Sequence, residues 1–164
     1  MLEKAGEIVD DVTNENTLVF TGSCTCKAIG FSAESLRPLW YCHCRQCRNM
    51  TGHFMAAAQA DLDKITITGE PKWYYVSDTA RHGFCQNCGS QLFWRDDTKP
   101  YLSITGGSLD DTSKLQVGGH IYTAEKGHYY ELLPEEKQYT SWHDPNPAPN
   151  SDADNGVEKQ NHCN

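Results

Sequence analysis

Seven of the eight cysteines gather in three short clusters whose spacing is typical of metal ligands. The clusters are Cys24-Thr25-Cys26, the segment from Cys42 to Cys47, and Cys85-Gln86-Asn87-Cys88. Seven thiolates divide most naturally into a group of four and a group of three. A site of four thiolates is closed and structural, whereas three protein ligands leave zinc a free position for water or substrate. This division favours a catalyst.

The first and third clusters together supply four sulfurs. Cys24 and Cys26 are two residues apart, so on an extended strand both side chains lie on one face. Cys85 and Cys88 form a knuckle in which Gly89 can take the positive φ that a tight turn often needs. The two pairs predict a closed zinc site that joins residues far apart in the chain and stabilises a small β core.

The middle cluster supplies three sulfurs, because Cys42 and Cys44 share a strand face and Cys47 follows three residues later. If the segment 45–51 is helical, its N-terminal amides face the sulfurs and stabilise their anionic form. The sequence offers no obvious fourth ligand. An alternative grouping, in which Cys24 and Cys26 join this cluster, stays open on counting alone.

The nearby histidines are weaker candidates for ligands. His43 lies between two cysteines of one face and should point to the opposite side, where we expect it to be packed or hydrogen-bonded. His53 lies within reach of the cluster, but a lone histidine is more often a surface or core residue. Spacing leaves the roles of His82 and His120 undecided.

Composition supports metal binding in a reducing compartment. Eight cysteines in 164 residues fall below the roughly 8–10% that marks a disulfide scaffold. The first twenty residues carry acidic side chains and no long apolar run, so we expect no secretory signal, no membrane span and a cytoplasmic location. The formal charge of −8 disfavours nucleic acid as a partner, and the oligomeric state is not readable from the sequence.

Short strand-like runs separated by turn residues predict an all-β domain. Two segments, 45–51 and 110–114, offer a turn or two of helix, and no long helix is available to connect parallel strands. The predicted strands are residues 17–21, 27–32, 39–41, 54–58, 65–68, 72–76, 82–84, 91–94, 101–104 and 120–122.

The predicted organisation has three parts. Residues 1–16 form a polar lead-in, residues 17–133 form a zinc-binding β domain, and residues 134–164 form a polar tail rich in Pro, Asn and Asp. Parts of this tail can still lie along the surface of the domain. Cys163 and His162 stand near the chain end, and we interpret both as exposed and incidental.

Five motifs follow one another along the chain: Gly22-Ser23-Cys24-Thr25-Cys26, Cys42-His43-Cys44-Arg45-Gln46-Cys47-Arg48 with Thr51-Gly52, Phe84-Cys85-Gln86-Asn87-Cys88-Gly89-Ser90, Gly107-Ser108-Leu109-Asp110 and His120-Ile121-Tyr122. Together they resemble the glutathione-dependent formaldehyde-activating enzyme and centromere protein V family. The resemblance covers about residues 20–123 in the same order.

The resemblance implies a β-tent fold with two zinc ions per chain. It implies a structural zinc on Cys24, Cys26, Cys85 and Cys88, and a catalytic zinc on Cys42, Cys44 and Cys47. The implied activity is that of a carbon–sulfur lyase, the reversible condensation of formaldehyde with glutathione to S-hydroxymethylglutathione.

The substrate is the least determined part of this prediction. Four cationic side chains are candidates to meet the carboxylates of glutathione, although each is more often a solvated surface charge: Arg45, Arg48, Lys72 and Arg81. We expect an enzyme acting on a thiol and a small carbonyl compound, or on a related adduct in a specialised pathway. The rival hypothesis is a zinc-stapled binding module. An enzyme should show a pocket with the middle cluster at its floor, and a binding module an exposed apolar or basic patch.

Overall fold

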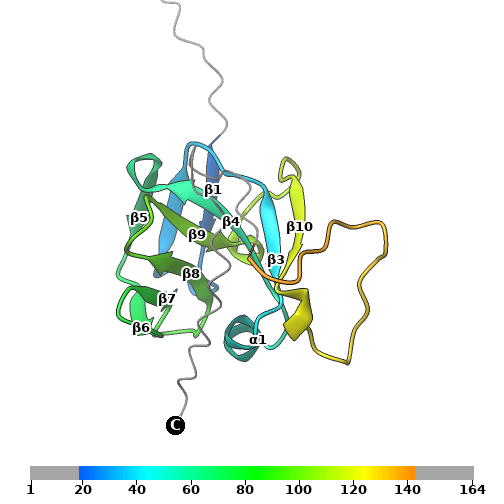
Figure 1. Ribbon diagram of the computed structural model, residues 1–164. Helices are drawn as coiled ribbons and strands as arrows, with labels where there is room; N and C mark the ends of the chain where they lie inside the picture. The colour runs from blue at the N-terminus through cyan, green and yellow to red at the C-terminus, as the bar shows by residue number, and fades with distance from the viewer. Residues whose placement is uncertain (1–18, 143–164) are drawn as a thin grey trace, which may run out of the picture.

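The structure, a computed structural model, describes residues 19–142. Within this range ten strands form two sheets, and the α-helix is seven residues long (Figure 1). The predicted all-β class is confirmed. The strands are β1 (Phe20–Ser23), β2 (Gly30–Ala33), β3 (Leu39–Cys42), β4 (Met55–Asp61), β5 (Ile65–Thr68), β6 (Lys72–Tyr75), β7 (Ala80–Phe84), β8 (Gln91–Asp96), β9 (Tyr101–Thr105) and β10 (Val117–Ile121). The helices are α1 (Arg45–Thr51) and the 3-10 turns η1 (Leu62–Lys64), η2 (Gly106–Ser108) and η3 (Thr123–Glu125).

The smaller sheet has the order β1-β2-β5 and is antiparallel. Its apolar side chains pack with those of β8 and β9 in the main hydrophobic core. Phe31 of β2 meets Phe93 of β8 edge to face, with ring centroids 5.7 Å apart. Burial of a side chain the size of Phe93 or Ile104, both fully buried, contributes about 1.5–3 kcal/mol each. This core holds the two sheets together.

The larger sheet has the order β10-β3-β4-β9-β8-β7-β6. All its neighbours pair antiparallel except β10 and β3, which are parallel, with His120 opposite Tyr41. The sequence predicted short antiparallel sheets because no crossover helix is available. The parallel pair β3 and β10 needs no crossover helix, because the long connection between these two strands consists of β4 to β9.

The helix α1 spans the segment predicted from the sequence, and Gly52 ends it in the left-handed conformation with φ 79°. The helical turn predicted at residues 110–114 is wrong. There the carboxylate of Asp111 accepts a hydrogen bond from the backbone N–H of Ser113 at 2.8 Å, which favours a turn over a helix.

The strand predicted at residues 27–32 begins only at Gly30, because Lys27 has φ 64° within a tight turn. In that turn the N–H of Lys27 donates to Cys24 O at 3.0 Å and the N–H of Cys24 donates to Ile29 O at 2.9 Å. The first cysteine pair therefore lies in a turn and not on the straight strand that its spacing predicted.

Residues 126–142 follow η3 as the long yellow-to-orange loop in Figure 1 and return beside β10. The N–H of His120 donates to Lys137 O at 2.8 Å, and the N–H of Tyr139 donates to His120 O at 2.9 Å. Part of the segment assigned to the tail is thus hydrogen-bonded to the sheet. The domain boundaries at residues 16 and 133 stay predictions, and the lead-in 1–16, His162 and Cys163 lie outside the described residues.

Candidate metal centres

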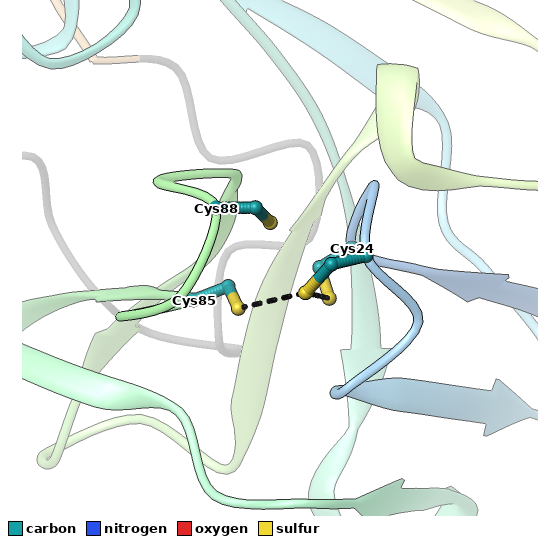
Figure 2. A group of neighbouring side chains, drawn as sticks. Cys24, Cys85 and Cys88 are labelled. Carbon is teal, nitrogen blue, oxygen red and sulfur yellow. Dashed lines mark hydrogen bonds between the residues drawn. The ribbon is translucent and has the colours of Figure 1, made fainter.

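Four cysteines from two loops converge on one point. The Sγ atoms of Cys24, Cys26, Cys85 and Cys88 all lie within 4.8 Å of one another. Figure 2 shows the labelled side chains turned toward one another from opposite loops. The sulfurs of Cys24 and Cys26 are 3.5 Å apart and those of Cys26 and Cys85 are 3.7 Å apart. A tetrahedral zinc with Zn–S bonds of about 2.3 Å places neighbouring sulfurs about 3.8 Å apart, so this donor set fits the ion.

Two knuckle-like turns position these sulfurs. The second turn connects β7 to β8, where the N–H of Gly89 donates to Cys85 O at 2.8 Å and Gly89 has the predicted positive φ, at 74°. A direct hydrogen bond joins the turns, from the N–H of Thr25 to the Ser90 hydroxyl at 3.1 Å. Cys24 and Cys85 are buried in the main core, which the turns therefore close at one end.

Three further cysteines converge where β3 meets α1. Cys42 ends β3, Cys44 is the N-cap of α1 and Cys47 lies in its first turn. Their Sγ atoms lie within 4.8 Å of one another, and the N–H of Cys47 donates to Cys44 Sγ at 3.4 Å. Cys42 and Cys47 are buried, whereas Cys44 is partly exposed. The alternative grouping, with Cys24 and Cys26 in this cluster, is not the one the structure shows.

The three sulfurs strongly influence each other's ionisation. The pKa of Cys44 is lowered to about 3, chiefly because the Cys42 and Cys47 thiols donate to its sulfur. Contact with the Cys44 sulfur raises the pKa of Cys42 to about 12, and contacts with both neighbours raise the pKa of Cys47. Without a cation, neutral pH therefore favours a single thiolate here. Three thiolates at these distances need a bound cation.

In the four-cysteine group the Ser90 hydroxyl lies 3.2 Å from the sulfur of Cys88. Hydrogen bonds from Ser90 lower the pKa of Cys88 to about 5. An ionised sulfur at neutral pH is a metal ligand in its reactive form. Both groups are therefore suited to soft, thiolate-preferring metal ions such as zinc.

His43 points away from the cysteines on either side of it, as predicted. Its ring is fully buried, with Nε2 2.8 Å from His120 Nδ1 and Nδ1 2.6 Å from the Tyr130 hydroxyl. Burial lowers the pKa of His43 to about 4, so the ring is neutral at pH 7. His120 is also buried, and its Nε2 lies 2.9 Å from a carboxylate oxygen of Glu136.

His53 and His82 are also hydrogen-bonded. The N–H of Phe54 donates to His53 Nδ1 at 2.8 Å, and the His53 ring packs against Tyr130 with centroids 4.5 Å apart. His82 is buried between two amides, with Gln46 Oε1 3.3 Å from Nε2 and Gln91 Nε2 3.1 Å from Nδ1. Gln46 belongs to α1, so His82 supports the first turn of the helix that carries Cys47.

The four candidate cations differ in position. Arg45 and Arg48 belong to α1, beside the three-cysteine group, and Arg48 Nε donates to His43 O at 3.1 Å. Arg81 pairs with Asp97 at 2.8 Å, while Lys72 is exposed on the edge strand β6. The structure therefore brings two of the four near the candidate site.

An open pocket of about 430 Å³ lies beside the four-cysteine turns and the C-terminal end of α1. Hydroxyl-bearing residues and methionines contribute to it, among them Thr25, Ser90, Met50 and Thr105. None of the seven cysteines lines this pocket. The expected pocket, with the middle cluster at its floor, is thus not this one.

Aromatic side chains contribute to the apolar cluster to which the three-cysteine group belongs. Trp94, Tyr122 and Tyr139 pack against the cluster that contains Cys42 and Cys47. Burial raises the pKa of Tyr122 to about 12, so its hydroxyl keeps its proton at neutral pH. Sequence reasoning did not predict a role for these aromatics, because only the return of β10 and the following loop brings Tyr122 and Tyr139 to β3.

The fold and the two thiol groups define a small β protein built around two cysteine sites that could bind two metal ions. The family model described as "Glutathione-dependent formaldehyde-activating enzyme" matches residues 19–125. The chain belongs to this family.

The chain is also similar to one lyase-named protein and to one solved structure. A Schizosaccharomyces pombe protein described as an "uncharacterized lyase" is 34% identical over 87 residues, which cover 51% of this chain and 64% of that protein. A crystal structure of a Rhodobacter sphaeroides protein matches with a TM-score of 0.48 and 23% identity, over 57% of this chain and 91% of that one. Within residues 19–142, the helices are too short and too polar to span a membrane.

Proposed function

We propose that this protein is a zinc-dependent carbon–sulfur lyase that forms or breaks an adduct between a thiol and a small aldehyde. Glutathione and formaldehyde are the first pair to test, since the matching family is described by them and the S. pombe relative is described as a lyase. The protein would bind two zinc ions and act in the cytoplasm, where thiols stay reduced.

The observation that carries the proposal is the difference between the two thiol groups. One has four sulfurs and the other has three, with Cys44 partly exposed between two buried cysteines. A zinc ion held by Cys42, Cys44 and Cys47 would supply a position for a thiolate or an aldehyde oxygen. The four-cysteine group would hold its ion for stability alone.

The reaction requires a carbon–sulfur bond to form and a proton to move. The substrate sulfur bonds to the aldehyde carbon, and the thiol proton ends on the oxygen as a hydroxyl group. Tyr122 packs against the three-cysteine group and stays protonated, so we assign its hydroxyl as the candidate donor to that oxygen. Trp94 and Tyr139 pack against the same apolar cluster.

The test measures exchange between formaldehyde, glutathione and their adduct by NMR, with the full-length protein and with Cys44→Ser. We expect exchange above the uncatalysed rate for the wild type and not for the variant. Exchange at the background rate with a protein that contains two zinc ions would reject this substrate pair. Related thiols and aldehydes would then be tested as substrates of a specialised pathway.

A zinc-stapled binding module is the second candidate, and one observation favours it. The 430 Å³ pocket lies away from the three sulfurs, and Cys42 and Cys47 are buried. In a binding module both ions would only stabilise the fold. A two-zinc protein that accelerates no thiol–aldehyde exchange and whose second ion never gains an added thiol as ligand would support this candidate.

A further inference from the structure

Four polar side chains form a continuous hydrogen-bonded chain behind the three-cysteine group. The hydroxyl of Tyr130 lies 2.6 Å from His43 Nδ1, and His43 Nε2 lies 2.8 Å from His120 Nδ1. His120 Nε2 lies 2.9 Å from Glu136 Oε2. The His43 and His120 rings are inclined by 26° with centroids 5.0 Å apart, so their nitrogens meet edge to edge.

Glu136 sets the direction of donation along this chain. A carboxylate only accepts, so His120 donates to Glu136 through its Nε2–H. In the tautomer that carries its proton on Nε2, His120 Nδ1 is an acceptor, and His43 donates to it through Nε2–H. The remaining acceptor, His43 Nδ1, receives the O–H of Tyr130. Every donor in the chain therefore points toward Glu136.

The first and last members of this hydrogen-bonded chain, Tyr130 and Glu136, belong to a segment that the family model does not cover. The model matches residues 19–125, whereas Tyr130 and Glu136 follow it. The two histidines are 0% and 3% exposed, so their ring nitrogens have little access to water. Tyr130 and Glu136 therefore satisfy buried nitrogens that would otherwise be unpaired.

The hydrogen-bonded chain includes His43, which lies between two of the three cysteines in the sequence. His43 stands between Cys42 and Cys44, and adjacent side chains of an extended segment point to opposite faces. The N–H of His43 donates to Ile121 O at 3.0 Å, and His43 O accepts from Arg48 Nε at 3.1 Å. The buried, hydrogen-bonded ring and these two backbone contacts together hold His43 in place between the two flanking cysteines.

We propose that Tyr130 and Glu136 are positioning residues for the three-cysteine site, which they orient through the buried His43 and His120. This inference rests on the metal-binding role proposed above for that site. Outer partners that orient metal ligands commonly change metal affinity by about 10–100-fold. Because Tyr130 and Glu136 act through an intervening histidine, we expect an effect near the lower end of that range.

Two conservative substitutions have matched controls next to them in the chain. Glu136→Gln keeps the side-chain size but replaces a charged carboxylate, which can only accept, with a neutral amide that can also donate, and Glu135→Gln makes the same change at an exposed neighbour. Tyr130→Phe removes the hydroxyl that donates to His43, and Tyr129→Phe removes a hydroxyl from a residue that is 63% exposed. Comparison of each variant with its control therefore distinguishes the loss of a hydrogen bond in this chain from the general effect of the same substitution.

The experiment measures the affinities of both zinc ions in the full-length protein by competition with a chromophoric chelator. We expect Glu136→Gln and Tyr130→Phe to weaken the more weakly bound ion about tenfold and to leave the tighter ion unchanged. Imidazole ¹⁵N NMR should show altered resonances of His43 and His120 in the same two variants. Both controls should match the wild type.

Three results would overturn the inference: equal affinities in a variant and its control, equal weakening of both ions, or unchanged imidazole resonances. Equal weakening would mean a general loss of stability instead of positioning. Failure of the metal-binding role on which this inference rests has a different signature, since the wild type would then bind a single ion or none. Failure of the proposed lyase activity would appear only in the exchange assay, with both zinc affinities unaffected.

Discussion

The sharpest difference between the two thiol groups should appear when one cysteine of each is replaced by serine. Cys88→Ser removes a ligand from the group that joins the turn after β1 to the turn between β7 and β8, and its neighbours Cys24 and Cys85 lie in the main core. Structural zinc sites contribute on the order of 10 kcal/mol. Because a domain is stable by only about 5–15 kcal/mol, we expect this variant to lose cooperative unfolding.

Cys44→Ser should have a much smaller effect on stability. Cys44 is the N-cap of α1 and accepts from the N–H of Cys47, and serine is a favoured N-cap that can accept the same hydrogen bond. Cys42 and Cys47 can stay buried as neutral thiols. We expect the substitution itself to cost about 1 kcal/mol or less, which is a few degrees in Tm, in addition to the stabilisation lost with one zinc ion at the free zinc concentration used.

The assay combines metal analysis with thermal unfolding followed by circular dichroism. The predicted pattern is about two zinc ions for the wild type, about one for Cys44→Ser with a sharp transition, and no sharp transition for Cys88→Ser. The reasoning would be refuted if Cys44→Ser unfolded as completely as Cys88→Ser. It would also be refuted if Cys88→Ser melted within a few degrees of the wild type.

Three further experiments test the packing at Gly22, the ionisation of His43 and the role of Tyr122. A Cβ at Gly22 would lie 2.3 Å from the Phe31 ring, so Gly22→Ala should cost about 1–3 kcal/mol in denaturant unfolding, whereas Gly107→Ala, with open space around it, should be nearly neutral; equal midpoints would contradict this packing. The pKa of His43 is lowered from 6.5 to about 4, so the unfolded chain binds more protons than the folded protein between these pH values. The free energy of unfolding should therefore fall as pH decreases from 6.5 to 4, by at most about 3 kcal/mol. In His43→Gln the free energy of unfolding should depend less steeply on pH, and an equal dependence would refute the assignment. Tyr122→Phe should lower the rate of thiol–aldehyde exchange about 10²-fold with both zinc ions retained, and an unchanged rate would exclude its hydroxyl as the proton donor.

The cysteine groups were predictable because their ligand spacing is local. Each pair or triplet lies within six residues, so strand and turn geometry restricts where its sulfurs can point. The helix at residues 45–51 and the direction of His43 followed from the same local rules. The four-plus-three grouping agreed with the structure because two turns held together by a hydrogen bond can share one ion.

The remaining parts of the site depend on contacts between distant residues. Tyr122, Tyr130 and Glu136 reach the cysteine loop only because β10 pairs in parallel with β3 and the following segment runs beside β10. Composition alone assigned Glu136 to a polar tail, since single-residue hydrogen bonds leave no periodic signal. The parallel pairing was likewise hidden, because six intervening strands separate the two partners in the chain.

The most direct test of the central claim is the visible spectrum of the full-length protein with Co²⁺ in place of zinc, recorded as glutathione is added. The account predicts two Co²⁺ ions in thiolate sites, of which one changes its d–d bands when the thiol binds, and it predicts that Cys44→Ser abolishes that change. A spectrum that does not respond to any added thiol or aldehyde, or a wild-type protein that binds a single ion, would contradict the claim that the three-cysteine group holds a metal with a free position.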